Sequence, residues 1–387
     1  MRLPRPWYEA LHERLRAGLE EAGLDALVLD DPLDVAYVTG FVHFPNERPV
    51  VAYVPRVGAV LLLVPELERE HAADQQVVAD LVVYPEFPGV RSPFAVLRDA
   101  VGVSPRRAGY AASTSVARTT ALAAAFGRTE WTISDLVGRL RLRKTPEEVA
   151  LHAEAARIAD AMLAAGVALV TEALAAGQLP TEAELAAHVT RFGTELMYAS
   201  HSEVVVVPML TGGLVYGGAN SAQPHRLPGG DRLRRGEPFM LSLGCAVGGR
   251  FVESERTFIL GEPTAEQRRY YEVVREAQEV GTQHLRPGVR CAEANRACLE
   301  VIRTAGLGEY LRHRQGHGIG LGFHEPPWVA DGDDTVLEPG MVLSSEPGIY
   351  VPGHAGYRIS DTVLVTADGP RRLTAYPRDL ADVTIGA

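Results

Sequence analysis

The chain has 387 residues and a formal net charge of −11, with 46% hydrophobic and 22% charged residues. This is the composition of a globular protein, the length suggests two domains, and the acidic balance disfavours nucleic-acid binding. The three cysteines (Cys245, Cys291 and Cys298) lack zinc-type spacing, and their odd number argues against a disulfide framework. With no apolar leader and no run of membrane-spanning length, we expect a soluble, cytoplasmic protein that binds neither membrane nor nucleic acid.

The first third of the chain alternates between helical and extended patterns. Apolar residues at helical spacing from Trp7 to Gly23 predict a first helix, and three short apolar runs between residues 26 and 65 predict buried strands. Helical and extended segments continue to alternate after them. This pattern predicts a compact α/β domain at residues 1–137, followed by a second domain at residues 138–387.

Capping boxes mark the helix starts of the second domain. Thr145 and Glu148, with a proline at the first helical position, predict a helix that continues to about Ala176. Similar boxes begin at Thr181 and Thr264. These helices should pack on a long-stranded antiparallel sheet, so the chain is expected to be an α/β (α+β) protein. The strand-like runs are at 203–210, 238–247, 251–260, 341–351 and 357–366.

The run RFVESERTF (250–258) carries the first candidate site. Glu253 and Glu255 are two residues apart, so their side chains share a face if the run is a strand. A solvated edge strand is one interpretation of this pattern. The other is a carboxylate pair in a pocket, which must bind a cation or a metal, or else have a raised pKa.

Three further segments place ligating or acid–base side chains beside glycine or proline. His317 and His324 lie in QGHGIGLGFHEPP (315–327), where glycines permit a close approach of backbone or ligand. Glu346 follows an apolar strand and precedes Pro-Gly, at a strand end. His225 lies in a loop, where its side chain could transfer protons. A single histidine is more often structural, but the glycine frame favours a site at 315–327.

In this order, the four segments resemble the pita-bread family of aminopeptidase P, prolidase, methionine aminopeptidase and creatinase. The runs GHGIGLxxHExP and EPGMVLxxEPGIY carry the resemblance, which spans the whole chain. It implies an N-terminal creatinase/prolidase-like domain and a C-terminal pita-bread catalytic domain. It also implies a hydrolase of C–N bonds that forms a homodimer.

The sequence departs from the metallopeptidases of this family at two metal-ligand positions. Their ligands are Asp, Asp, His, Glu and Glu, and by resemblance these positions fall on Ser242, Glu253, His317, Glu346 and Ser360. Neutral hydroxyls are poor ligands for divalent metals, so a two-metal site is not expected. A single Mn or Zn ion held by Glu253, His317 and Glu346 remains an alternative.

The resemblance to creatinase and ectoine hydrolase suggests the favoured hypothesis, a metal-independent hydrolase of a small zwitterion that needs no cofactor. In this hypothesis Glu255 and Glu346 bind the cationic part of the substrate. His225 activates water, while His317 and His324 orient the reacting carbonyl or amidine.

The remaining predicted contacts are with the substrate. Arg48 resembles an arginine that reaches the substrate carboxylate from the neighbouring subunit, and Glu253, Tyr357 and Arg358 are further candidates. A second hypothesis is an Xaa-Pro dipeptidase or aminopeptidase with one metal, which the HExP run at His324 favours. A third is a catalytically inactive binding protein of the same fold.

Overall fold

The structure is a computed structural model that describes residues 1–86, 91–204 and 211–386. The chain divides into two compact units, Arg2–Arg141 and Leu142–Ala387, and Met1 belongs to the second. The strand-like run predicted at 203–210 lies, apart from its first two residues, outside the described ranges.

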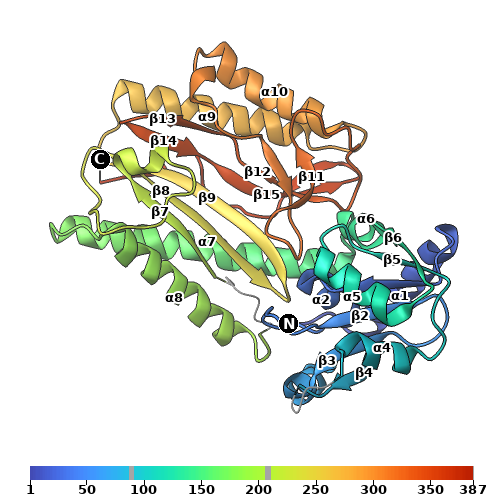
Figure 1. The fold of residues 1–387 in the computed structure, drawn as a ribbon. Coiled ribbons are helices and arrows are strands. Elements are labelled where there is room, and N and C mark those ends of the chain that lie inside the picture. The colour runs from blue at the N-terminus through green and yellow to red at the C-terminus, as the bar shows by residue number, and fades with distance from the viewer. Residues whose placement is uncertain (87–90, 205–210, 387) are drawn as a thin grey trace. The chain divides into compact units, whose positions relative to one another are not determined.

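The N-terminal unit is built on a six-stranded sheet with the order β4-β3-β2-β1-β5-β6 (Figure 1). Strand β1 is antiparallel to β2 and parallel to β5, so the sheet is mixed. The strands are β1 Ala26–Leu29, β2 Val51–Pro55, β3 Leu61–Pro65, β4 Asp80–Tyr84, β5 Arg107–Tyr110 and β6 Glu130–Ile133. The helices are α1 Arg5–Glu21, α2 Pro32–Thr39, α3 Arg69–Asp74, α4 Pro93–Val101, α5 Val116–Phe126 and α6 Leu136–Leu142, with the short 3₁₀ helix η1 Glu66–Glu68.

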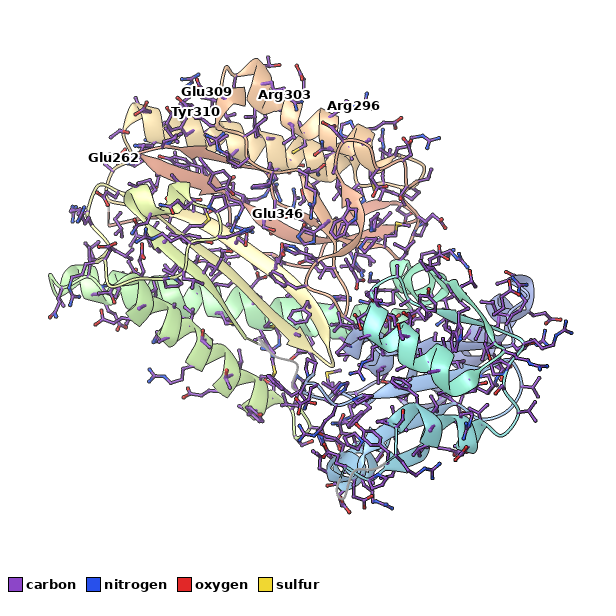
Figure 2. All side chains as sticks on the ribbon, in the orientation of Figure 1. Glu262, Arg296, Arg303, Glu309, Tyr310 and Glu346 are labelled. Carbon is purple, nitrogen blue, oxygen red and sulfur yellow. The ribbon has the colours of Figure 1, made fainter. Side chains whose placement is uncertain are left out.

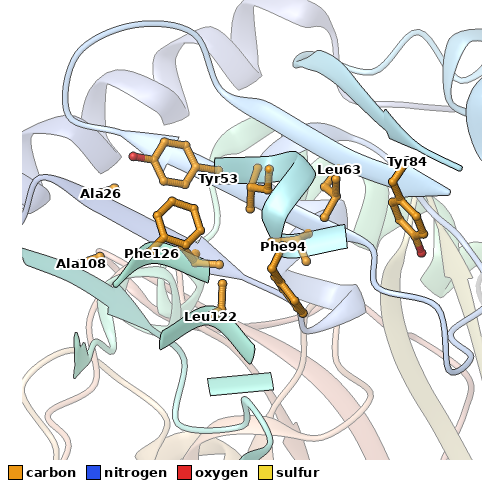
Figure 3. Close-up of a cluster of buried hydrophobic side chains, with 11 residues drawn as sticks. Ala26, Tyr53, Leu63, Tyr84, Phe94, Ala108, Leu122 and Phe126 are labelled. Atoms are coloured by element: carbon orange, nitrogen blue, oxygen red, sulfur yellow. The ribbon is translucent and has the colours of Figure 1, made fainter. Parts of the chain in front are cut away.

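The core of this unit lies between one sheet face and helices α4 and α5. Figure 3 shows Tyr53 and Leu63 of the sheet near Phe94 of α4 and Leu122 and Phe126 of α5. Alternate strand residues share a face, which is why the apolar strand runs can bury one row of side chains here. Each large side chain buried in this way contributes about 1.5–3 kcal/mol to folding.

The C-terminal unit contains a nine-stranded sheet with the main order β11-β10-β12-β15-β9-β8-β7. Strand β16 pairs with β15 and β17 pairs with β9, while β13 and β14 form a separate two-stranded sheet. The strands are β7 Thr211–Gly217, β8 Pro238–Val247, β9 Arg250–Leu260, β10 Gly316–Gly318, β11 Glu325–Val329, β12 Val342–Ser345, β13 Gly348–Val351, β14 Ala355–Arg358, β15 Ser360–Thr366, β16 Gly369–Arg372 and β17 Thr384–Ile385.

Two pairs of helices cover the strands of this unit. Helices α7 and α8 contact β7, β8 and β9 (Figure 1). Helix α9 contacts β12, β13, β14 and β16, and α10 contacts β11. The capping boxes predicted at Thr145, Thr181 and Thr264 are all present, and they begin α7, α8 and α9. The helices are α7 Pro146–Ala175, α8 Glu182–Ser200, α9 Ala265–His284 and α10 Cys291–Thr304, with the 3₁₀ helices η2 Gly218–Ala222 and η3 Gly308–Tyr310. The predicted mixed α/β class is confirmed.

Two predicted strands are each divided in the structure. The run 341–351 forms β12 and β13, and the run 357–366 forms β14 and β15. The large-sheet ladder reaches Ser345 opposite Asp361, and the small-sheet ladder resumes with Gly348 opposite Arg358. Pro347, which has no backbone N–H to donate, lies in the interruption between them. The chain changes sheets there, and a pattern of apolar residues does not reveal such a change.

Helix α7 corrects the expectation that no segment is long enough to span a membrane. Its length and apolar composition would suffice for a span. In the structure this helix packs against β8, β9 and α8, and 33% of its apolar window is buried. Its buried face carries mainly alanine, leucine, isoleucine and methionine, which explains the high hydropathy.

The first turns of α7 lie in a buried network of charges. Glu148 pairs with Arg250 at 2.8 Å, just before the carboxylates of β9. His152 Nδ1 donates to the carbonyl of Phe251 at 2.7 Å, and its Nε2 is buried without a hydrogen bond among the described residues. Burial, helped by the positive charges of Lys144 and Arg250, lowers the pKa of His152 to about 3.

We predict that His152 makes the C-terminal unit less stable in mild acid. Its pKa is near 6.5 in the unfolded chain and about 3 in the fold, so the unfolded chain binds the additional proton. The contribution of His152 to the free energy of unfolding is therefore fully present above pH 6.5. It is lost as the pH falls toward 3, by up to about 1.4 kcal/mol per pH unit. His152→Gln, which keeps a donor but cannot titrate, should flatten that part of the curve. Urea unfolding from pH 7 to 4 measures this, and parallel curves would contradict it.

Candidate functional site

Strand β9 brings the two predicted glutamates to one buried face of the sheet. Glu255 lies opposite Ser242 of β8 and Ser360 of β15, and opposite residues in antiparallel strands share a face. Ser242 donates a hydrogen bond to Glu255, and Ser360 donates to Glu253 at 3.3 Å. Both carboxylates are nearly inaccessible to solvent. Of the two interpretations of this run, the solvated edge strand is wrong, because both glutamates are buried on a strand that lies between β8 and β15.

His317, on β10, faces two carboxylates. Its Nε2 is 3.1 Å from Glu346 Oε1 and 3.4 Å from Glu253 Oε1, and it has no well-formed hydrogen bond. Its other nitrogen, Nδ1, lies 3.0 Å from the carbonyl oxygen of Gly318, which requires a proton on Nδ1. Figure 2 shows Glu346 among the strands of the unit, away from the α10 residues Arg296 and Arg303. A lone pair of Nε2 facing two carboxylate oxygens is an arrangement that a cation would stabilise.

The pKa shifts of this cluster show how strongly it favours positive charge. Burial alone lowers the pKa of His317, but Glu253 and Glu346 outweigh it and raise that pKa to about 11. Burial likewise opposes ionisation of Glu346, yet His317 holds the pKa of Glu346 at about 2. Burial raises the pKa of Glu253 despite His317. Without another cation, the cluster therefore retains a proton on His317 at neutral pH.

Arg358 neutralises the second glutamate. Its Nε lies 2.5 Å from Glu255 Oε2, and its NH2 group donates to Glu255 Oε1 at 3.1 Å and to Ser242 Oγ at 2.8 Å. Its remaining terminal nitrogen donates to the Tyr350 hydroxyl at 3.1 Å. Burial raises the pKa of Glu255 to about 7, against the lowering effect of Arg358. Glu255 therefore has an internal cation as its partner, and the prediction that it binds a substrate cation has no support in this arrangement.

His324 lies at the exposed edge of the cluster. Its ring centroid is 3.9 Å from that of His317, and its Nε2 is 3.8 Å from Glu253 Oε1, while 45% of its side chain is exposed. Burial and the charge of His317 lower the pKa of His324 to about 4, and Arg314 and His225 contribute to the lowering. His225, just beyond η2, is exposed and close enough to act electrostatically on His324. His324 is therefore neutral at neutral pH.

Two other predicted substrate contacts lie apart from the cluster. Tyr357 precedes Arg358 on β14, so it points to the opposite face, where its hydroxyl bonds to His354 at 2.8 Å and its ring packs on Tyr270. Its position therefore gives no support to substrate binding. Arg48 belongs to the N-terminal unit and pairs there with Glu86 and Glu47. Its proposed reach to a neighbouring subunit stays a prediction.

The sequence analysis missed two residues that support the site, His313 and Lys144. His313 Nε2 lies 2.7 Å from the Tyr350 hydroxyl, which also accepts the bond from Arg358. Lys144 forms a buried ion pair with Glu325 at 2.8 Å, directly after His324 in the chain. The position of His313 four residues before His317 was a usable signal, whereas nothing in the run RLRKTP indicates a buried lysine.

We predict that Lys144→Met destabilises the C-terminal unit by about 3 kcal/mol, because it leaves the Glu325 carboxylate buried without its cation. The double variant Lys144→Met/Glu325→Gln should lose clearly less than the sum of the two single variants. The neighbouring Arg143, which is exposed and pairs with Glu338, provides the control: Arg143→Met should change stability by less than about 1 kcal/mol. Denaturant unfolding measures all four variants, and additive losses would show that the pair is not coupled.

Family models match both units of the chain. Residues 150–367 match metallopeptidase family M24, and residues 12–143 match the creatinase/prolidase N-terminal domain. The chain is 33% identical over 378 residues to a probable dipeptidase PepE of Mycobacterium tuberculosis, with 95% of each chain covered. It is 32% identical over 383 residues to an Xaa-Pro dipeptidase of Lactobacillus helveticus, which covers 96% of this chain and 99% of the relative.

A solved structure agrees with these matches. The Xaa-Pro dipeptidase from Bacillus anthracis superposes with a TM-score of 0.82 at 28% identity, covering 98% of this chain and all of the other. The expectation that no cofactor is needed is therefore wrong, because most of the C-terminal unit matches a metallopeptidase family. The side chains agree with this correction: Glu253, His317 and His324 offer ligand atoms within 4.8 Å of one another.

Proposed function

The chain belongs to metallopeptidase family M24 and is a hydrolase of C–N peptide bonds, and we propose that it is an Xaa-Pro dipeptidase that works with a single divalent metal ion. The observation that carries the proposal is His317 Nε2, buried and facing Glu253 and Glu346 without a hydrogen bond. The resemblance to the pita-bread peptidases, seen first in the sequence motifs, is confirmed. The match to a metallopeptidase family also favours a peptidase over the third hypothesis, a catalytically inactive binding protein.

The charges of the site fit one metal ion better than two. When all three are ionised, Glu253, Glu255 and Glu346 carry three negative charges, and Arg358 supplies one fixed positive charge beside Glu255. Two negative charges remain, which one divalent ion would neutralise. The residues that would hold it are Glu253, His317 and Glu346, and His324 offers a further ligand atom within 4.8 Å of those of Glu253 and His317. Three protein ligands leave a position for water, as catalytic zinc sites require.

The side chains around these ligands have distinct tasks in the proposed reaction. A divalent metal bound there would lower the pKa of a bound water molecule and polarise the scissile carbonyl. His324 is neutral at neutral pH and lies at the edge of the ligand cluster, so its protonated ring nitrogen can donate to the carbonyl oxygen of the substrate. His225 is exposed near His324, where it can deliver a proton to the leaving nitrogen.

The first test of this proposal is the requirement for metal. After loading with Mn²⁺ or Zn²⁺ and desalting, the protein should retain about one ion per chain and cleave Ala-Pro. A chelator should abolish cleavage and added metal should restore it. His317→Ala should retain no ion at the same loading, because it removes the central nitrogen ligand. Cleavage that persists in chelator, or a protein that retains no metal, would overturn the single-metal proposal.

A second test concerns the two serines. Ser242→Asp with Ser360→Glu places two carboxylates beside Glu255 and Glu253, and should raise the retained metal from about one to about two ions per chain. The matched control is Ser242→Asn with Ser360→Gln, which adds similar volume without charge. Metal content by elemental analysis distinguishes the two pairs. Equal metal content in both would mean that these serines do not occupy ligand positions.

The cytoplasmic location, the homodimer and the role of Arg48 across an interface are further parts of the proposal. They rest on the family resemblance. Sedimentation of the purified protein tests the dimer directly, and a monomer that cleaves Ala-Pro at full rate would separate the activity from dimer formation.

A further inference from the structure

The loop that carries His225 (residues 218–230, the His225 loop) follows β7 and begins with η2. His225 is exposed, and its charge contributes to lowering the pKa of His324, so the loop holds the two side chains near each other. A group that delivers a proton must lie within hydrogen-bonding reach of the atom that receives it. The contacts that fix this loop therefore bear on the reaction.

Tyr216, near the end of β7, binds the loop directly before His225. Its hydroxyl donates a hydrogen bond to the carbonyl oxygen of Pro224 at 2.6 Å, and its side chain is fully buried. Burial raises the pKa of Tyr216 to about 12, and contacts with Arg358 and Ser242 lower it, which places both of these side chains beside the hydroxyl. Tyr216 thus connects Arg358 to the residue before His225.

Glu182, the first residue of α8, ties the start of the His225 loop to its end. One carboxylate oxygen accepts from the backbone N–H of Gly217 at 2.8 Å and from the side-chain amide of Asn220 at 2.9 Å. The other accepts from the backbone N–H of Gly229 at 2.9 Å. Glu182 is almost completely buried, and a buried carboxylate is costly unless donors satisfy it. The three donors therefore hold the loop closed around this carboxylate.

A third contact joins the His225 loop to β14. Ser221 Oγ accepts from the backbone N–H of Gly356 at 2.8 Å and donates to the carbonyl of Gly218 at 2.6 Å. A side chain at Gly356 would come within 2.0 Å of the Ser221 carbonyl oxygen, so the two backbones are in close contact. Gly356 lies on the same strand as Arg358. The loop is thus held from β7, from α8 and from β14.

We propose that Tyr216 is a positioning residue of the reaction: through Pro224 it fixes the backbone that carries His225, and Glu182 closes the same loop from α8. The Tyr216 hydroxyl is committed to Pro224 and the side chain is shielded from solvent, so Tyr216 acts through the loop. The backbone before His225 sets where its ring can lie, and an error of about 1 Å in such a group can cost about 100-fold in rate. This inference rests on the proposed function, because it requires a task for His225.

The kinetic test removes the Tyr216 hydroxyl. Tyr216→Phe should lower kcat for Ala-Pro about 10- to 100-fold and change KM less than about threefold, because the loop serves proton delivery and not substrate binding. In the His225→Ala background the same substitution should have no further effect on kcat, since a residue that acts through His225 has nothing left to position. An unchanged kcat in Tyr216→Phe, or losses that multiply in the double variant, would overturn the proposal.

Tyr271→Phe is the matched control. Tyr271, on α9, is also fully buried, and its hydroxyl donates to a backbone carbonyl, that of Arg378, at 2.9 Å. The substitution removes the same atom and the same kind of hydrogen bond, so the two variants should lose a similar amount of thermal stability. Only Tyr216→Phe should lose kcat. An equal loss of kcat in both variants would show a general effect of destabilisation, and would also overturn the proposal.

Limited proteolysis tests the loop without reference to activity. Trypsin can cleave after Arg226, the residue that follows His225, once the loop leaves its contacts. Tyr216→Phe and Glu182→Gln should each raise the rate of this cut several-fold, as followed by mass spectrometry. Glu184→Gln, which removes the same charge from an exposed position of the same helical turn, should leave the rate as in the wild type.

The two measurements separate this inference from the proposed function. If both loop variants are cut faster but the wild type does not cleave Ala-Pro, the proposed function fails and the anchoring of the loop by Tyr216 and Glu182 stands. If the wild type cleaves Ala-Pro but neither variant is cut faster after Arg226, the inference fails and the function stands.

Discussion

Two buried carboxylates with a third, partly buried one beside them are the constraint on which the rest of this structure depends. Glu253 and Glu255 lie on β9, where solvent scarcely reaches them, and Glu346 approaches from the residue that follows β12. Such a group would repel itself unless cations compensate for its charge. The fold supplies Arg358 as a permanent cation for Glu255, and it presents His317 to the other two. The unbalanced charge that remains is the physical basis for a metal ion at this place.

The Glu255 side and the Glu253 side of the cluster have different functions. On the Glu255 side, the two terminal nitrogens of Arg358 donate to the carboxylate, to Ser242 and to Tyr350. On the Glu253 side, His317 Nε2 has no well-formed bond and His324 is partly exposed. A closed, self-satisfied polar cluster stabilises the fold, whereas an open one binds ligands. The reaction is therefore expected on the side of Glu253 and His324.

The surrounding scaffold holds this open side in position. The start of α7 is tied to β9 by the buried pair of Glu148 with Arg250, and to the His324 loop by Lys144 with Glu325. Glycines permit this packing: a side chain at Gly320 would come within 2.1 Å of the Glu325 carboxylate. The metal ligands and the acid–base groups thus share one support, which the geometry of catalysis requires.

The sequence by itself determined the local structure and much of the ligand set. Capping boxes place the starts of α7, α8 and α9 because they satisfy backbone donors within a single turn, and the spacing of Glu253 and Glu255 places both on one face because strand side chains alternate. The motifs around His317, His324 and Glu346 were enough to identify the peptidase family.

Only the tertiary structure decided which charges meet. The pairing of Arg358 with Glu255, the contact of Lys144 with Glu325 and the stacking of Arg314 on Trp328 all join residues from separate segments. Their energies depend on distance and burial, which sequence spacing does not record. Because sequence spacing does not record distance and burial, the sequence analysis placed Tyr357 at the substrate. For the same reason, the favoured hypothesis omitted the metal. The negative charge that the protein leaves uncompensated at the site can be counted only when the folded strands bring the charged side chains together.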